Sequence, residues 1–149
     1  MTNLKHFHEE CKKLTMKQVK AKINGHGLNL QVAETKEQQK NGLMHRQTLD
    51  KDSGMIFVYN QPIMASFWMK NTKIPLSIAF VGQNNEIFQI EDMIPGDLTS
   101  VKSLKPCKYA IEVNKGWFED KNIKLKDIVS FPKNIYNKKR TIKIKIESV

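Results

Sequence analysis

Glu112 stands in the middle of the apolar run Tyr-Ala-Ile-Glu-Val, where a charged side chain is out of place. If this run is a strand, alternation puts Glu112 on the face opposite its apolar neighbours. A carboxylate in apolar surroundings needs a cation or a hydrogen-bond donor, or else its pKa rises. Arg46 is the candidate partner, and a structural Arg46–Glu112 pair is the interpretation that we favour.

A second interpretation places the same residues in a binding site. Along Ser66 to Thr72, alternation puts Trp68 and Lys70 on one face, where an indole ring and an ammonium group can hold a ligand together. The structural alternative is that Trp68 covers one end of the core and Lys70 lies over it. Asn71 is expected in a turn. The candidate ligand-binding residues are Arg46, Trp68, Lys70, Asn71, Glu112 and Trp117, and the ligand expected for them is small and anionic or polar.

Signatures of catalysis are missing from the sequence. It has no Gly-x-Ser-x-Gly elbow, no phosphate-binding glycine loop and no His-Glu-x-x-His. His45 can act as a base, but no nearby residue is a nucleophile for it to activate. His6, His8 and Cys11 form a much weaker metal signal than paired Cys-x-x-Cys motifs. We expect no catalytic residue, no cofactor and no metal, and an enzyme is the less favoured class.

The positive charge is concentrated at the two ends of the chain. The net charge is +10, but residues 27–131 hold thirteen basic and twelve acidic residues. Residues 1–26 contribute +4, from six Lys and two Glu, and residues 132–149 contribute +5, from six basic residues and one Glu. Such ends are often only solvated, although they can also bind a polyanion or an acidic protein surface.

The compartment is inferred from segments that the sequence lacks. Met1 to Ile23 contains no apolar run of the length that a secretory signal or a membrane span needs. Cys11 and Cys107 are too few for a disulfide framework. We expect a cytoplasmic protein with reduced thiols, or a component of a virus particle, and no membrane association.

Alternation of apolar and polar residues predicts several strands. The stretches 19–23 and 28–32 alternate on either side of Asn24-Gly25-His26-Gly27, which predicts a hairpin. Further strands are expected at 55–59, 66–71, 76–81, 86–90, 108–114, 128–131 and 141–147.

A single helix is expected among these strands. Thr35 and Gln38 have the spacing of a capping box, which predicts a helix that runs to about Met44 and contains Gly42. Many short strands and one short capped helix favour a mainly β fold with a minor α+β character, a compact antiparallel β-barrel or sandwich. The basic N- and C-terminal extensions flank this fold.

Three separate blocks carry a family resemblance. They are Gly42 to Arg46 (GLMHR), Gly54 to Tyr59 (GMIFVY) and Phe67 to Phe80 (FWMKNTKIPLSIAF). With these blocks the chain resembles the bacterial and archaeal family called domain of unknown function 192, over about residues 28–131. The resemblance implies a β-barrel-like domain with a helix across one side. After Pro-Leu the family pattern commonly has an acidic residue, and this chain has Ser77.

The sequence therefore divides into an extension at 1–26, a family domain at 27–131 and an extension at 132–149. We expect a non-catalytic interaction domain that docks on a protein partner or a larger assembly through its ends. An apolar stripe at helical spacing near the N-terminus and an alternating C-terminal strand suit this role. The candidate partner-binding residues are Leu4, Phe7, Leu14, Lys138, Lys139, Arg140, Ile142 and Ile144. The alternatives are a small-molecule binder or enzyme using Arg46, Lys70, Asn71 and Glu112, and nucleic-acid binding through the ends.

Overall fold

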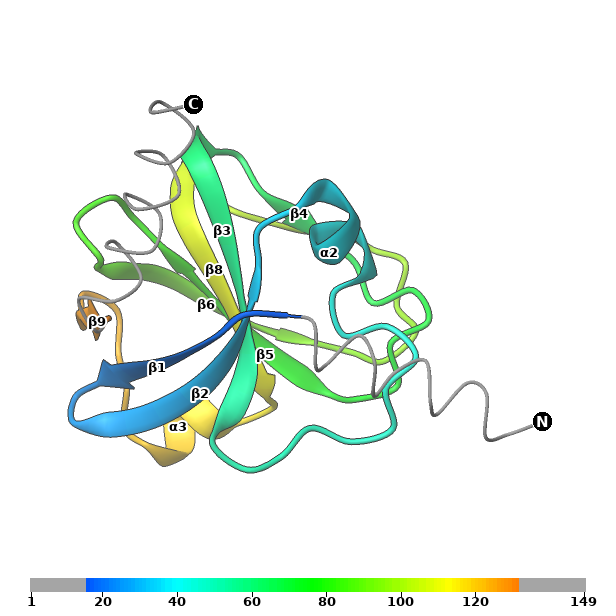
Figure 1. The fold of residues 1–149 in the computed structure, drawn as a ribbon, viewed down its shortest axis with the longest axis horizontal. Helices are drawn as coiled ribbons and strands as arrows, with labels where there is room; N and C mark the ends of the chain where they lie inside the picture. The colour runs from blue at the N-terminus through cyan, green and yellow to red at the C-terminus, as the bar shows by residue number, and fades with distance from the viewer. Residues whose placement is uncertain (1–15, 132–149) are drawn as a thin grey trace, which may run out of the picture.

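A seven-stranded sheet curls into a half-barrel in the computed structural model, which describes residues 16–131 (Figure 1). The strands follow the order β6-β5-β8-β3-β2-β1-β9. Their bounds are β1 Gln18–Ile23, β2 His26–Ala33, β3 Ser53–Ile63, β5 Leu76–Val81, β6 Ile87–Met93, β8 Cys107–Asn114 and β9 Val129–Ser130. A separate pair consists of β4 Ser66–Phe67 and β7 Val101–Lys102, and the helices are α2 Lys36–Asn41 and α3 Trp117–Asp120. The predicted mainly β fold is confirmed.

One strand pair departs from the antiparallel arrangement expected from the sequence. β1 and β2 form the predicted hairpin, with Asn24 and Gly25 at positive φ as a tight two-residue turn requires. β2 and β3, however, run parallel. A parallel pair needs a crossover connection, and here the segment that contains α2 supplies it.

The sheet is covered on both faces along its central strands. Alternate residues of β1, β2, β3, β5 and β8 point into the curl and form one core with α3, which includes Leu30, Ile56 and Ile111. The opposite face of β3, β5 and β8 packs under α2, β4 and the segments beside them and forms a second core, which includes Phe57 and Phe80. In Figure 1, α2 and β4 lie together on the side away from β9.

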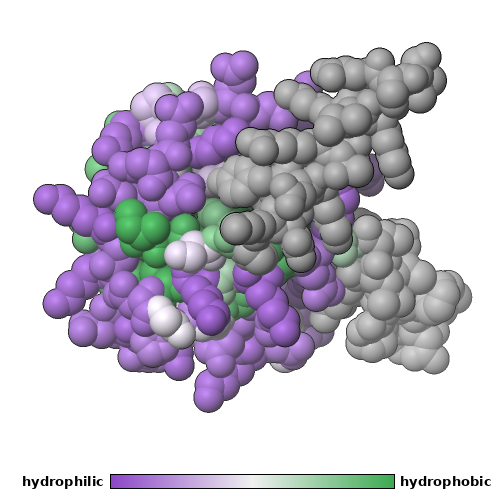
Figure 2. All heavy atoms as spheres, turned by 60° about the vertical axis from the view of Figure 1, so that its left-hand side comes forward, coloured by the Kyte–Doolittle hydropathy of each residue, from purple (hydrophilic) through white to green (hydrophobic). Residues whose placement is uncertain are grey.

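The two edges of the sheet, at β6 and β9, come together beside the first core. The N–H of Ile87 at the start of β6 donates to the carbonyl of Asp127 (2.9 Å), and the N–H of Val129 donates to the carbonyl of Asn85 (2.9 Å). Figure 2 shows this side of the molecule, with hydrophobic side chains near the middle and hydrophilic ones around them. Leu125 and Ile128, in the segment before β9, are about half exposed.

Several element limits differ from the sequence-based expectation. β3 continues through Pro62 to Ile63, with a shift in its pairing to β8 after Val58, where Lys108 Nζ donates to the carbonyls of Tyr59 (2.6 Å) and Asn60 (3.0 Å). β4 has only two residues, and β7 and α3 were not expected.

Helix α2 is shorter than predicted. The capping box is present, because Thr35 Oγ1 accepts from the N–H of Gln38 and the Gln38 side chain accepts from the N–H of Thr35. The helix ends at Asn41, and Gly42 follows it with φ +48° instead of lying inside it. A left-handed backbone rather than close helix packing explains this glycine.

The expected division at residue 26 does not follow the sheet, since β1 pairs with both β2 and β9. The other terminal predictions lie outside the described residues. These are the stripe of Leu4, Phe7, Cys11 and Leu14, the strand at 141–147, and the basic residues Lys138, Lys139 and Arg140.

Candidate functional site

Glu112 occupies the middle of a row of side chains that crosses the outer face of the sheet. On β8, it pairs with Met55 of β3 on one side and with Ile78 of β5 on the other. Met55 in turn pairs with Gln31 of β2. Neighbouring strands lie about 4.8 Å apart, so Glu112 and Gln31 are two strand spacings from each other.

A hollow of about 330 Å³ opens above Glu112. Its walls come from the end of α2, from β3 and from the segment around β4. The side chain of Phe67 packs edge-on against Phe57, with ring centroids 4.8 Å apart, and this contact braces the wall. The lining residues are Gln39, Lys40, Asn41, Gly42, Leu43, Met44, Phe57, Tyr59, Ile63, Met64, Ala65, Ser66, Phe67, Trp68, Thr72 and Glu112.

The carboxyl group of Glu112 is buried and has no partner among residues 16–131. The residue is 4% exposed, and within residues 16–131 its side chain makes no hydrogen bond or ion pair. Burial alone raises the pKa of Glu112 to about 8. No fully enclosed polar side-chain atom of the described residues lacks a partner, so the carboxyl oxygens of Glu112 must reach the open space of the hollow.

Gly42 keeps the space above this carboxyl open. A β-carbon at this position would lie 3.9 Å from Glu112 Oε1 and 3.6 Å from the ring of Phe57. Any larger side chain there would therefore extend over the acid. Tyr59 is a second acid in the wall, and its pKa is raised by burial first and then by Cys107 and Glu112.

Helix α2 is fastened over the hollow by Gln39. Its side-chain Nε2 donates to the carbonyl of Val58 (2.9 Å) and to that of Ala33 (3.2 Å), and so ties the helix to β3 and β2. The N–H of His45 donates to the carbonyl of Asn71 (2.8 Å), which ties the chain after α2 to the segment after β4. The hollow is therefore framed by elements that are bonded to one another.

Arg46 does not pair with Glu112, and the favoured Arg46–Glu112 interpretation is wrong. The guanidinium donates to Gln31 Oε1 and lines a separate hollow of about 140 Å³. The reason is the register of the sheet, which places Met55 between Gln31 and Glu112. A pair of residues on one face need not be neighbours.

Lys70 and Asn71 also lie away from the carboxyl. Trp68 is half exposed at the edge of the hollow, and Lys70 Nζ lies over its ring, 5.2 Å from the centroid. Asn71 is exposed and has φ +55°, as the expected turn requires. Of the six candidate residues, the hollow brings together Trp68 and Glu112.

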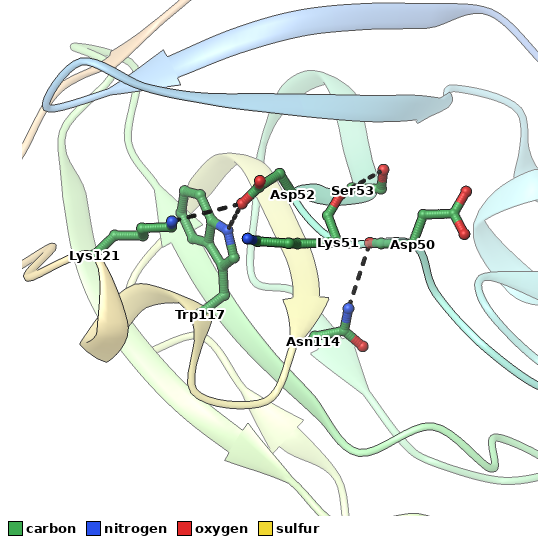
Figure 3. Close-up of polar contacts among 7 residues, drawn as sticks. All are labelled: Asp50, Lys51, Asp52, Ser53, Asn114, Trp117 and Lys121. Atoms are coloured by element: carbon green, nitrogen blue, oxygen red, sulfur yellow. Dashed lines mark hydrogen bonds and ion pairs between the residues drawn. The ribbon is translucent and has the colours of Figure 1, made fainter.

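Trp117 lies in another part of the molecule, where it has a structural role (Figure 3). It is 7% exposed, and its Nε1 donates to Asp52 Oδ1 (2.8 Å), which lowers the pKa of that carboxyl. Lys121 lies 3.9 Å from the same oxygen. In the same region Asn114 donates to the carbonyl of Leu49 (2.9 Å), so this polar cluster joins the β2–β3 crossover to the end of β8.

Ser77 lies on the other face of the sheet from the hollow, whereas its neighbours Leu76 and Ile78 belong to the second core. Its hydroxyl donates to Asp92 (2.7 Å) and accepts from the N–H of Gly116 (3.0 Å). The departure from the family pattern at this position therefore does not alter the wall of the hollow.

Sequence reasoning missed the aromatic wall formed by Phe57, Tyr59 and Phe67. The available signal was the set of three blocks, each of which supplies lining residues: Gly42, Leu43 and Met44 from the first, Phe57 and Tyr59 from the second, and Phe67, Trp68 and Thr72 from the third.

Comparison with known proteins agrees with this fold. The model of the family DUF192, described as "Uncharacterized ACR", matches residues 18–131. The chain belongs to this family. No protein with a curated description matches this chain.

Two solved structures are similar over most of their length. A protein of unknown function from Novosphingobium aromaticivorans is 36% identical, with a TM-score of 0.75, over 77% of this chain and 86% of that one. A putative transcription regulator from Sinorhizobium meliloti is 25% identical, with a TM-score of 0.75, over 78% of this chain and 95% of that one. The fold of this chain is thus shared with both proteins.

Residues 16–131 hold neither a metal-binding cluster nor a helix that could span a membrane. They contain no cluster of three or more His, Cys, Asp or Glu side chains arranged to hold a metal ion. In the same part of the chain, none of the helices has the length and apolar character to cross a membrane. His6, His8 and Cys11 lie outside the residues described.

Proposed function

We propose that this DUF192 protein binds a small molecule in the hollow above Glu112. The observation that carries the proposal is a buried carboxyl group, without a partner among the residues that the structure describes, at the base of a hollow with aromatic residues in its wall. Folding removes the carboxyl from water, and such a group is normally compensated by a partner. A ligand that contacts it would supply that compensation.

The lining favours binding over catalysis. His45, the one candidate base, is exposed and is not part of the wall. The titratable groups of the wall are Glu112, Tyr59 and Lys40, and Lys40 is exposed at the end of α2. A partly aromatic wall with few titratable groups, one of them a buried carboxyl, is typical of a site that recognises one functional group of a ligand.

A melting-temperature screen with a blocked variant tests the proposal. The Ser66→Phe change adds a ring at the exposed edge of the hollow, and Ser100→Phe adds the same ring at an exposed position outside the wall. We expect compounds from a library of amines, organic acids, sugars and nucleosides to raise the melting temperature of the wild type and of Ser100→Phe. They should not raise that of Ser66→Phe. A library without hits, or hits that stabilise all three proteins equally, would refute a ligand site here.

A second proposal concerns the basic ends, whose charges of +4 and +5 contrast with a nearly neutral domain. We propose that they dock the protein on a protein partner or a larger assembly, in the cytoplasm or in a virus particle. Gel filtration of the source lysate at low and high salt tests this. Elution in a large particle supports docking, whereas elution as a 17.3 kDa monomer at both salt concentrations contradicts it.

Nucleic-acid binding through the same ends is the remaining alternative, and the name of the Sinorhizobium relative, a putative transcription regulator, makes it worth testing. It predicts an affinity for duplex DNA that falls steeply with salt, because each neutralised phosphate releases counterions. An affinity that does not change with salt would exclude this mode.

A further inference from the structure

We propose that the ligand of the Glu112 hollow is a small organic cation, and that the ammonium group of this ligand sits against the carboxylate of Glu112. The inference rests on the proposed ligand-binding function and specifies the chemical class of the ligand. It follows from the distribution of charge around the hollow, the composition of its walls and its size.

Three cations near the hollow, Arg46, Lys70 and Lys108, are engaged elsewhere. Arg46 donates to Gln31, two strands away from Glu112. Lys70 lies over the outer ring of Trp68. Lys108 donates to two backbone carbonyls of β3. Within the described residues, therefore, Glu112 has a place for a positive charge and no side chain that fills it.

The other titratable groups near Glu112 do not reverse this argument. Lys40 lines the hollow from α2 but is exposed, and burial is the only influence on the pKa of Glu112. Tyr59 on β3 and Cys107 on β8 are both acids with a raised pKa, since burial disfavours their charged forms. None of these groups provides a buried positive charge that would attract an anionic ligand.

The walls suit a cation as well. Phe57, Tyr59, Phe67 and Trp68 supply four aromatic rings, and the face of an aromatic ring attracts positive charge. Lys70 already uses one face of Trp68 in this way, 5.2 Å from the ring centroid. Aromatic rings that surround a cation are a known means of recognising ammonium ligands, and here a carboxyl group lies at the base of the wall.

The energetics also favour a cation over an anionic ligand. Folding has already removed most of the Glu112 side chain from water, so a ligand has little of it left to desolvate. With a pKa of about 8, roughly one molecule in ten carries the carboxylate at neutral pH, and an ammonium group would shift this equilibrium to the charged form. A carboxylate ligand would instead be repelled by Glu112 or would require it to stay protonated.

The volume limits the size of the ligand. The volume of the hollow, about 330 Å³, lies at the lower end of the range for small-molecule sites. That range begins at about 300 Å³. The hollow suits an ammonium group on a short apolar chain, and the exposed Met64 and Ile63 border the opening where that chain would end.

Three probes with four carbons each and head groups of different charge test the inference. Butylammonium carries a positive charge, n-butanol carries no charge and butanoate carries a negative charge. Each is titrated into the full-length protein at about pH 8.5, where Glu112 is largely ionised. The shifts of the Gly42 and Phe67 amide signals in NMR spectra report binding in the hollow. We expect butylammonium to bind at least about tenfold more tightly than either other probe.

Two variants show whether the preference comes from the site. Glu112→Gln keeps the shape of the side chain and removes its charge, so the preference for butylammonium should disappear. Trp68→Leu removes an exposed ring and should weaken butylammonium binding by a few-fold while the fold is kept, which gives a second test if Glu112→Gln does not fold.

The outcomes separate the two levels of the proposal. Equal binding of the three probes to the wild type, or a preference that survives in Glu112→Gln, would overturn the cation and leave the hollow as a ligand site. If none of the probes binds and the library screen also gives no hit, the ligand-binding function itself is wrong.

Discussion

At the scale of single residues, the buried acid Glu112 should make the stability of the protein depend on pH. Its pKa is about 8 in the folded protein, against 4.5 for an ordinary glutamate. The unfolded chain therefore releases this proton between about pH 4.5 and 8 while the folded protein keeps it, and the free energy of unfolding falls over that interval. Each pKa unit corresponds to about 1.4 kcal/mol, so the loss amounts to a few kcal/mol.

The Glu112→Gln variant should lack this component. We expect wild type and variant to have similar free energies of unfolding near pH 4.5 and the variant to be the more stable one near pH 9. Urea unfolding across this range measures both. Glu119→Gln, a change at an exposed position of α3, should keep the wild-type pH dependence. Curves for Glu112→Gln that run parallel to the wild type would show that Glu112 is not buried as described.

At the scale of elements, the approach of β3 to β8 depends on Gly54. A β-carbon at this position would lie far inside contact distance of the backbone oxygen of Glu112, and 3.1 Å from Val113. Backbone atoms cannot turn aside as a flexible side chain can. We expect Gly54→Ala to lower the free energy of unfolding by about 3 kcal/mol or more, because the two strands must separate.

The matched control is Gly27→Ala on β2. No atom lies within 4 Å of a β-carbon at that position, so the free energy of unfolding should change by less than about 1 kcal/mol. Urea unfolding of both variants measures the difference. Equal effects of the two changes would mean that β3 and β8 are not in such close contact.

At the scale of the whole molecule, the half-barrel is held together where its two ends meet. The carboxylate of Asp127 accepts a hydrogen bond from Asn24 in the β1–β2 turn (2.7 Å) and another from the N–H of Lys124 (2.7 Å). Its backbone carbonyl accepts from Ile87 at the start of β6. Asp127→Ala should therefore lower the free energy of unfolding by about 1–2 kcal/mol.

Hydrogen exchange distinguishes loss of closure from a general loss of stability. In Asp127→Ala, the amides of Ile87 and Val129 should exchange faster, whereas those of the central strand β8 should change little. The exposed Glu91→Ala on β6 serves as the control and should leave both sets unchanged. If all amides of Asp127→Ala accelerate equally, the ends of the sheet are not an independent point of closure.

Local order could be predicted from the sequence. Alternation located β1, β2, β5 and β8, and the spacing of Thr35 and Gln38 predicted the capped start of α2. The alternation of residues 109–113 also placed Glu112 on the face opposite Tyr109 and Ile111, as the structure does. These features succeed because they depend on neighbours within a few residues, where a period of two fixes the faces of a strand.

The partners of those faces were decided by the tertiary structure. Alternation does not specify which strand lies beside which, and the parallel β2–β3 pair with its register puts Met55 between Gln31 and Glu112. Arg46 consequently bonds to Gln31, and Glu112 is left without a counter-ion among the described residues. The sequence by itself thus determined most of the strands of the main sheet, the β1–β2 turn and the position of the acid among apolar residues. Long-range strand pairing depends on the packing of the whole sheet. This pairing decided that the side chain of Glu112 faces a hollow and does not form an ion pair with Arg46.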